Sequence, residues 1–190
     1  MIRADVYTLI PEINWINDQT LREKCVDVWF EAIETSGWGG HGLEKMPIVL
    51  KGLPLDDPDN NNIKHTRSVA RLSAKIYDEL HDFFPEAGEA DRDVLIASAI
   101  LHDVGKLLEY DYVDGQAVAR PESAAGAQMF THPYLGACLV RKHGLPQKIE
   151  HAILAHSELM SPGGAAAFHT RESMIVKYAD TISFYYLLKR

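Results

Sequence analysis

The stretch DRDVLIASAILHDVGKLL, residues 91–108, decides the fold. Its middle is almost entirely apolar over a length that favours a helix, so we expect a helix buried on most of its sides. The apolar run leads directly into His102 and Asp103. Burying an imidazole beside a carboxylate is costly unless the two are paired or bound to a metal. One alternative is structural: Asp103 merely accepts a hydrogen bond from a neighbouring histidine.

Helical patterns surround this stretch on both sides. Apolar residues recur at helical spacing, and Pro133 and Pro146 stand where prolines open helices. The expected helices cover residues 18–34, 65–84, 133–143, 146–159 and 171–188, while residues 109–131 read as an irregular excursion. No window alternates with period two over the length of a strand. We therefore predict an all-α fold, a helical bundle.

A polar loop, GLPLDDPDNNN at residues 52–62, is the best internal boundary. It divides the chain into an N-terminal helical extension with its loop, residues 1–60, and a helical domain over residues 61–190. A chain of 190 residues is long enough for one domain with such an extension.

Further histidines and one aspartate stand at positions that favour a metal site. His65 precedes an amphipathic helix, His132 stands before a helix-opening proline, and His156 lies on an apolar helix. Asp180 falls inside MIVKYADTISF, where a carboxylate needs a partner. Imidazole and carboxylate together suit one or two divalent ions such as Fe, Mn, Ni or Zn, and the sequence has no clustered cysteines of a structural zinc site.

The segments HTRSVARLS, LHDVGK and IVKYADTIS, in that order, resemble the HD superfamily of metal-dependent phosphohydrolases. The resemblance covers about residues 61–185 and implies an HD-domain helical bundle. It implies that His65, His102, Asp103 and Asp180 hold one metal. His132 and His156 resemble the two additional histidines of the binuclear branch, in which Asp103 would bridge to a second metal. Lys106, one turn after His102, would neutralise a phosphate oxygen, unless it is only a solvated helix end.

Departures from that branch narrow the expectation. Ser157 stands where the HD-GYP phosphodiesterases have a second consecutive histidine, and their GYP element is missing. Asn61 stands where trinuclear members offer a carboxylate, so we expect at most two metals. The segment LHDVGKLLEYD followed by LAHSE is also similar to the HD domain of certain 3′–5′ exoribonucleases, a looser similarity from which we do not assign RNA cleavage.

The expected function is hydrolysis of a phosphate ester or anhydride in a small, nucleotide-like molecule by metal-activated water, with Asp103 and Lys106 as catalytic residues. His169 and Arg171 form the most plausible additional anion-binding pair. Two alternatives use the same ligand set: a mixed-valent di-iron oxygenase, and a nucleotide-binding regulatory protein that retains its metal.

Charge and hydropathy limit the partners. The net charge is −8, and the sequence has no block rich in lysine and arginine. Both features argue against binding to long nucleic acids. No apolar stretch approaches a membrane-spanning length, and Asp5 and Glu12 interrupt the region where a signal peptide would be apolar. Two distant cysteines fit free thiols. We therefore expect a cytoplasmic protein with a small phosphorylated substrate and no membrane; the oligomeric state is open.

Overall fold

The computed structural model describes residues 3–36, 38–39, 42–50, 53–87, 90–114, 116–119, 131–157 and 169–188. The described chain is a helical bundle with one small hairpin, which confirms the predicted all-α fold. The elements, in chain order, are α1 Asp5–Leu9, η1 Pro11–Trp15, α2 Gln19–Ser36, η2 Leu43–Lys45, α3 Asn62–Phe83, η3 Pro85–Ala87, α4 Arg92–Leu101, α5 Lys106–Glu109, β1 Tyr110–Val113, β2 Gln116–Ala119, α7 His132–Lys142, α8 Gln147–Ala155 and α9 Arg171–Leu188.

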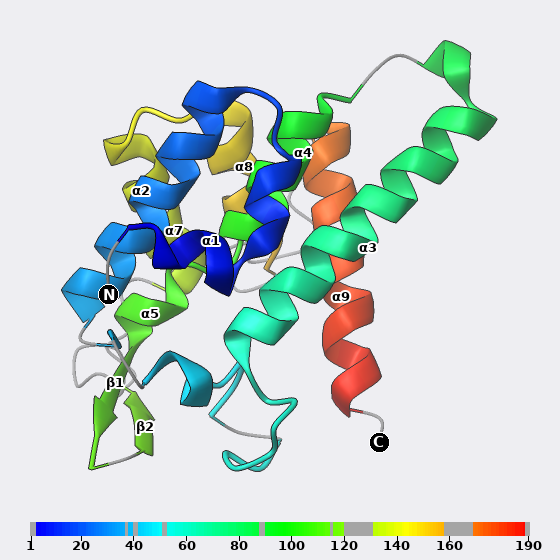
Figure 1. Cartoon of the computed structure of the whole chain (residues 1–190). Helices are drawn as coiled ribbons and strands as arrows, with labels where there is room; N and C mark the ends of the chain where they lie inside the picture. The colour runs from blue at the N-terminus through cyan, green and yellow to red at the C-terminus, as the bar shows by residue number, and fades with distance from the viewer. Residues whose placement is uncertain are drawn as a thin grey trace.

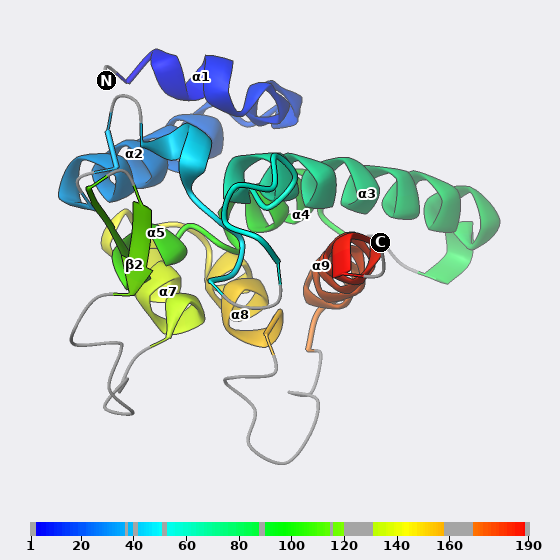
Figure 2. The ribbon, with the colours of Figure 1, turned by 90° about the horizontal axis from the view of Figure 1, so that it is seen from below.

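Helix α4 lies at the centre of the bundle. Its residues from Val94 to Leu101 are all buried, as the apolar run predicts. It packs against α3, α9, α8 and α2. Figure 1 shows α3 and α9 crossing beside it, and Figure 2 shows α7 and α8 on the side of α4 opposite α1. The surrounding helices therefore bury α4 on all sides from Val94 onward, and its C-terminal end lies inside the molecule.

The continuous helix expected over residues 91–108 is interrupted. Helix α4 ends at Leu101, the chain turns through residues 102–105, and the short α5 begins at Lys106. Gly105 allows α7 to approach this turn closely, because a Cβ at this position would lie 2.0 Å from the carbonyl oxygen of His132. The interruption is located at the His-Asp pair and brings α5 close to the start of α7.

The irregular excursion expected over residues 109–131 contains regular structure in its first part. Strands β1 and β2 form an antiparallel hairpin in which Tyr110 pairs with Ala119 and Val113 with Gln116. Asp114 in the turn has a positive φ of 49°. The sequence did not reveal strands of only four residues, and residues 120–130 lie outside the described part of the chain.

The N-terminal segment packs directly on the helical bundle. Its side chains Val6, Ile13 and Trp29 belong to the same hydrophobic cluster as Ile100 and Val176. The indole Nε1 of Trp29 donates a hydrogen bond to the carbonyl oxygen of Ile100, 3.2 Å away. The predicted extension, residues 1–60, thus shares its core with α4, while the boundary near residue 60 stays a prediction.

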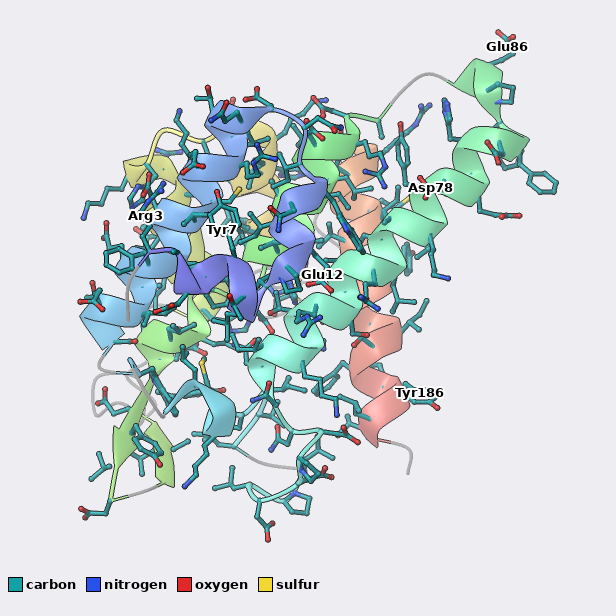
Figure 3. All side chains as sticks on the ribbon, viewed as in Figure 1. Arg3, Tyr7, Glu12, Asp78, Glu86 and Tyr186 are labelled. Atoms are coloured by element: carbon teal, nitrogen blue, oxygen red, sulfur yellow. The ribbon has the colours of Figure 1, made fainter. Side chains whose placement is uncertain are left out.

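A buried carboxylate ties η1 to α3. Glu12 is 1% exposed, and it accepts hydrogen bonds from Nε of Arg67 at 3.0 Å and from Nε of Arg71 at 2.8 Å. Figure 3 shows Glu12 where η1 faces α3. Burial alone would raise the pKa of Glu12, but the bonds from the two guanidinium groups lower it below its ordinary value. The ionised carboxylate is therefore the form that joins the two elements.

Candidate metal centre

Six side chains meet where α4 ends. His102 and Asp103 follow α4, His65 lies on the first turns of α3, and Asp180 lies in the middle of α9. His132 is the first residue of α7, and His156 follows the last residue of α8. Helices α3, α8 and α9 pack against α4, and α7 packs against α8, so residues far apart in the sequence share one interior site. The structure brings together every metal ligand expected from the sequence.

The two carboxylate oxygens of Asp103 face two different pairs of imidazoles. Oδ2 lies 3.6 Å from Nε2 of His65 and 3.5 Å from Nε2 of His102. Oδ1 lies 3.3 Å from Nε2 of His132 and 3.5 Å from Nε2 of His156. A carboxylate placed in this way can serve two ions, one through each oxygen.

Asp180 completes the first of these groups. Its Oδ1 lies 3.0 Å from Nε2 of His65 and 3.8 Å from Nε2 of His102. Two donor atoms bound to one ion through bonds of about 2.1 Å lie about 3.0 to 3.4 Å apart, depending on coordination geometry. The measured separations are close to this spacing, so the residues fit two neighbouring ions.

Hydrogen bonds on the far sides of the rings fix three imidazoles. Nδ1 of His102 donates to the carbonyl of Ala99 at 2.8 Å, and Nδ1 of His156 donates to the carbonyl of Ile153 at 2.5 Å. Nδ1 of His132 lies 3.2 Å from Oε2 of Glu109. Because carbonyl and carboxylate oxygens only accept, each Nδ1 carries a proton and each neutral ring turns its Nε2 lone pair to the centre.

The remaining imidazole is held by a hydroxyl group. Nδ1 of His65 lies 3.0 Å from Oγ of Ser183, which donates to Oγ of Ser68 at 3.2 Å. Ser183 lies on α9, one turn after Asp180. The last helix therefore contributes a carboxylate to one side of His65 and a hydroxyl to the other.

Burial and charge keep the donors in their metal-binding forms. Burial lowers the pKa of His102 to about 4 and also lowers that of His132, so both rings are neutral at pH 7. Burial opposes ionisation of Asp103, but the positive charge of Lys106 beside it holds the pKa of Asp103 well below the usual value. Burial likewise opposes ionisation of Asp180, yet the hydrogen bond with His65 brings its pKa down to about 2.

The centre thus gathers lone pairs and negative charge with few protons between them. Nε2 of His132 lies 3.3 Å from Nε2 of His156, although neutral rings with protonated Nδ1 atoms have no proton to share there. A cation between such acceptors removes the conflict. This donor chemistry, and not only the spacing, fits divalent metal ions.

Lys106 is not a solvated helix end. It is 7% exposed, and its Nζ donates to Oδ2 of Asp103 at 2.7 Å. It also lines a cavity of about 500 Å³ into which His65, Asp103 and Asp180 open. A cation at the edge of the metal ligands can meet an anionic group in that cavity.

Sequence reasoning missed Glu109, Ser183 and Lys177. Glu109 is 4% exposed, and besides facing the His132 ring it accepts a hydrogen bond from the His132 backbone N–H at 2.7 Å. Its signal was available: a carboxylate one helical turn after Lys106, between Leu108 and Tyr110, has no reason to be there without a partner. Lys177 lines the cavity one turn before Asp180.

His169 and Arg171 are not placed together with the metal ligands. The backbone N–H of His169 donates to Nε2 of His151 at 3.3 Å, and the two rings lie 5.3 Å apart. Arg171 lines a separate small cavity with His81 and Phe84. The geometry of the described residues gives no support to the expected anion-binding pair.

Comparison with known proteins identifies the family. The HD domain family matches residues 62–185, and the chain belongs to this family. Similar proteins include Ribonuclease Y of Cutibacterium acnes, 26% identical over 163 residues, which are 86% of this chain and 25% of that protein. Ribonuclease Y of Pelobacter propionicus is 30% identical over 147 residues, which are 76% of this chain and 22% of that protein. No solved structure matches.

Two limits follow from these comparisons. The chain spans at most about a quarter of the length of these curated relatives. Their name refers to RNA, and it gives no support to the expectation that long nucleic acids are excluded as partners. Within the described part of the chain, no helix is long and apolar enough to cross a membrane.

Proposed function

We propose that this chain hydrolyses a phosphate ester or anhydride bond of a nucleotide-like substrate at a binuclear metal centre. His65, His102, Asp103 and Asp180 hold the first ion, Asp103 bridges, and His132 and His156 complete the second. The observation that supports the proposal is the placement of the two carboxylate oxygens of Asp103, with Oδ2 facing one pair of imidazoles and Oδ1 facing the other.

Two divalent ions held here would lower the pKa of water and polarise a phosphoryl oxygen. The water oxygen bonds to phosphorus, the bond from phosphorus to the leaving oxygen breaks, and the proton that the water loses is balanced by the proton that the leaving oxygen takes up. The chain's own residues prepare this step. Three imidazoles are fixed in one tautomer, and Lys106 stands beside Asp103, where it can neutralise a phosphoryl oxygen.

RNA is a second candidate substrate. The matching relatives are named as ribonucleases, and ribonuclease chemistry also breaks a bond from phosphorus to oxygen. The net charge of −8 offers little attraction to long nucleic acids. A short ribonucleotide is consistent with both the ribonuclease relatives and the negative net charge, because it has a phosphodiester bond without a long polyanionic backbone.

The test is turnover by the metal-loaded protein. We expect the Mn²⁺- or Fe²⁺-loaded chain to cleave members of a panel of phosphomonoesters, phosphodiesters, nucleotides and short RNAs. His102→Ala and Asp103→Ala should abolish the activity, while His81→Ala, on the exposed part of α3, should retain it. Silence across the panel, with metal confirmed in place, contradicts the proposal.

Further measurements on the metal-loaded protein distinguish the two alternative functions, an oxygenase and a regulatory protein. Oxygen consumption and a di-iron spectroscopic signature in the iron-loaded protein would identify an oxygenase. Nucleotide binding without product over hours would identify a regulatory protein. Both outcomes preserve the metal centre and remove only the hydrolytic chemistry.

A further inference from the structure

The cavity at the metal centre is larger than a phosphoryl group requires. Its volume of about 500 Å³ falls in the range of about 300–1,000 Å³ that is typical of sites for small organic ligands. Five of the six candidate metal ligands line it, and the remaining lining is of mixed chemistry. The additional residues must therefore recognise parts of the substrate beyond the reacting group.

One face of α9 supplies a cation, a metal ligand and an aromatic ring in succession. Lys177, Asp180, Thr181 and Phe184 all line the cavity, and their spacing places them on one side of the helix. At a rise of about 1.5 Å per residue, Lys177 precedes Asp180 by about 4.5 Å and Phe184 follows it by about 6 Å. The cation and the ring thus lie on opposite sides of the metal ligand.

Lys177 is a cation without a carboxylate partner among the described residues. Its Nζ makes one long hydrogen bond, 3.4 Å, to the carbonyl oxygen of His156. That bond uses one of three ammonium protons and would by itself make Lys177 a structural cap of α8. Lys106 differs in that its charge is balanced by the Asp103 carboxylate, although its remaining protons can still reach a phosphoryl oxygen. Lys177 therefore has hydrogen-bonding capacity left for an anion in the cavity.

Apolar side chains also line the cavity. The ring of Phe184 is half-buried, and Ile48, Val49 and Leu50 line the same cavity from the segment before α3. The side chain of Asn60 holds this segment, because its Oδ1 accepts from the backbone N–H of Ile48 at 2.9 Å and its Nδ2 donates to the carbonyl of Val49 at 3.1 Å. A planar, weakly polar group such as a nucleobase suits a cavity that is lined by an aromatic ring and by these aliphatic side chains, which we call the aliphatic wall.

We infer that Lys177 and Phe184 determine the substrate class: a nucleotide that has a second phosphate on the side of the scissile phosphoryl group away from the base. Phe184 and the aliphatic wall receive the base, the metal centre receives the scissile phosphoryl group, and Lys177 binds the phosphate beyond it. A nucleoside polyphosphate and a 5′-phosphorylated dinucleotide both present this chemistry. The inference rests on the proposed function and adds the orientation of the substrate in the cavity, with its base at Phe184 and its second phosphate at Lys177.

Calorimetric binding to the Mn²⁺-loaded full chain tests the inference. The probes are nucleoside 5′-monophosphates, the β,γ-methylene analogues of the triphosphates and 5′-phosphorylated dinucleotides, each with the four bases, together with inorganic pyrophosphate. Lys177→Gln should weaken binding of the triphosphate analogue or of the dinucleotide about tenfold and leave the monophosphate within twofold. Lys75→Gln, an exposed lysine of α3, matches the change of charge and should alter neither.

Phe184→Leu tests the other end of the cavity. It should weaken binding of every nucleotide about tenfold, because a stacked base is lost, and leave inorganic pyrophosphate within twofold. The Lys177→Gln variant also distinguishes the two kinds of substrate. The probe whose binding it weakens, the triphosphate analogue or the dinucleotide, is the one whose second phosphate Lys177 binds. Equal losses for mono- and triphosphate in Lys177→Gln, no loss at all, or no binding of either probe to the wild type would overturn the inference. If any of these outcomes is observed but the protein still hydrolyses bis(p-nitrophenyl) phosphate, the inference is wrong and the proposed hydrolase function is retained.

Discussion

At the scale of single residues, the centre depends on which nitrogen of each ring carries the proton. His102 and His156 donate through Nδ1 to carbonyl oxygens three residues earlier in their own helices. His132 is the first residue of its helix and has no such carbonyl, so Glu109 takes this role. The histidines and aspartates were predictable from residue type and order. The need of Glu109 for a partner was also visible in the sequence, but its pairing with His132 was not, because that pairing depends on the turn that brings α5 against α7.

Glu109 should therefore control binding of the second metal. In Glu109→Gln the acceptor for Nδ1 of His132 is weakened, and we expect metal affinity at the second site to fall about 10- to 100-fold. Binding at the first site should change little. A metal titration followed by calorimetry measures both events.

Glu79→Gln provides the matched control, since Glu79 is exposed on α3 and distant in sequence from the ligands. It should reproduce the wild-type titration. If Glu109→Gln also leaves both binding events unchanged, Glu109 has no part in positioning His132.

At the scale of secondary-structure elements, the sequence predicted helices well and their interruptions poorly. The expected helix 171–188 coincides with α9, and Gly144 ends the α7 segment with a positive φ of 63°, as a helix C-terminus requires. The turn at residues 102–105 went unrecognised because its cause is a contact with α7, which no local pattern records. The hairpin was missed because each strand has only four residues and finds its partner inside the loop.

Gly105→Ala tests the contact between α5 and α7. The new Cβ would lie 2.0 Å from the carbonyl oxygen of His132 and 2.6 Å from the backbone nitrogen of Gly136, so backbone must move. We expect a loss of about 1–3 kcal/mol in the free energy of unfolding, measured in urea, and weaker binding of the second metal.

Gly39→Ala is the appropriate comparison. Its Cβ would meet only Cγ2 of Ile33 at 3.8 Å, an ordinary contact. It should change stability by less than about 0.5 kcal/mol. Equal stabilities of the two variants would show that the close approach at Gly105 is not required.

The attachment of η1 to α3 should depend on pH. The folded-state pKa of Glu12 is below its ordinary value of 4.5, so its ionised form stabilises the fold above that pH and the contribution disappears as the pH falls through the folded-state pKa. Glu12→Gln should cost about 1–3 kcal/mol at pH 7, a range lowered because both arginines are partly exposed.

Urea unfolding of wild type and Glu12→Gln at a series of pH values measures this difference. It should be constant near neutrality and shrink below about pH 4.5. Glu34→Gln, exposed on α2, should show no such dependence. A difference that persists unchanged in acid would rule out the ionised carboxylate as the source of stability.

At the scale of the whole molecule, residues 1–60 and the helical domain form one hydrophobic core. The sequence suggested an extension because a polar loop separates the two parts. It did not reveal that Trp29 packs on α4 and donates to Ile100, since such a contact lies 71 residues apart in sequence. We propose that the extension and the domain fold as one cooperative unit.

Trp29→Ala tests this unit. Removing a fully buried indole should lower the free energy of unfolding by about 3–5 kcal/mol and should lower the stability of the metal centre in the same transition. Phe83→Ala, at a side chain that is 71% exposed, should have little effect. Two separate transitions, one for each part, would contradict a shared core.

The central claim is that Asp103 joins two metal sites, and metal content measures it most directly. Elemental analysis of the chain purified without chelators should find two transition-metal ions per chain. His132→Ala should retain about one ion and Asp103→Asn fewer than one, while His81→Ala should match the wild type. A wild-type chain without metal, or an Asp103→Asn variant with its two ions intact, would contradict the account.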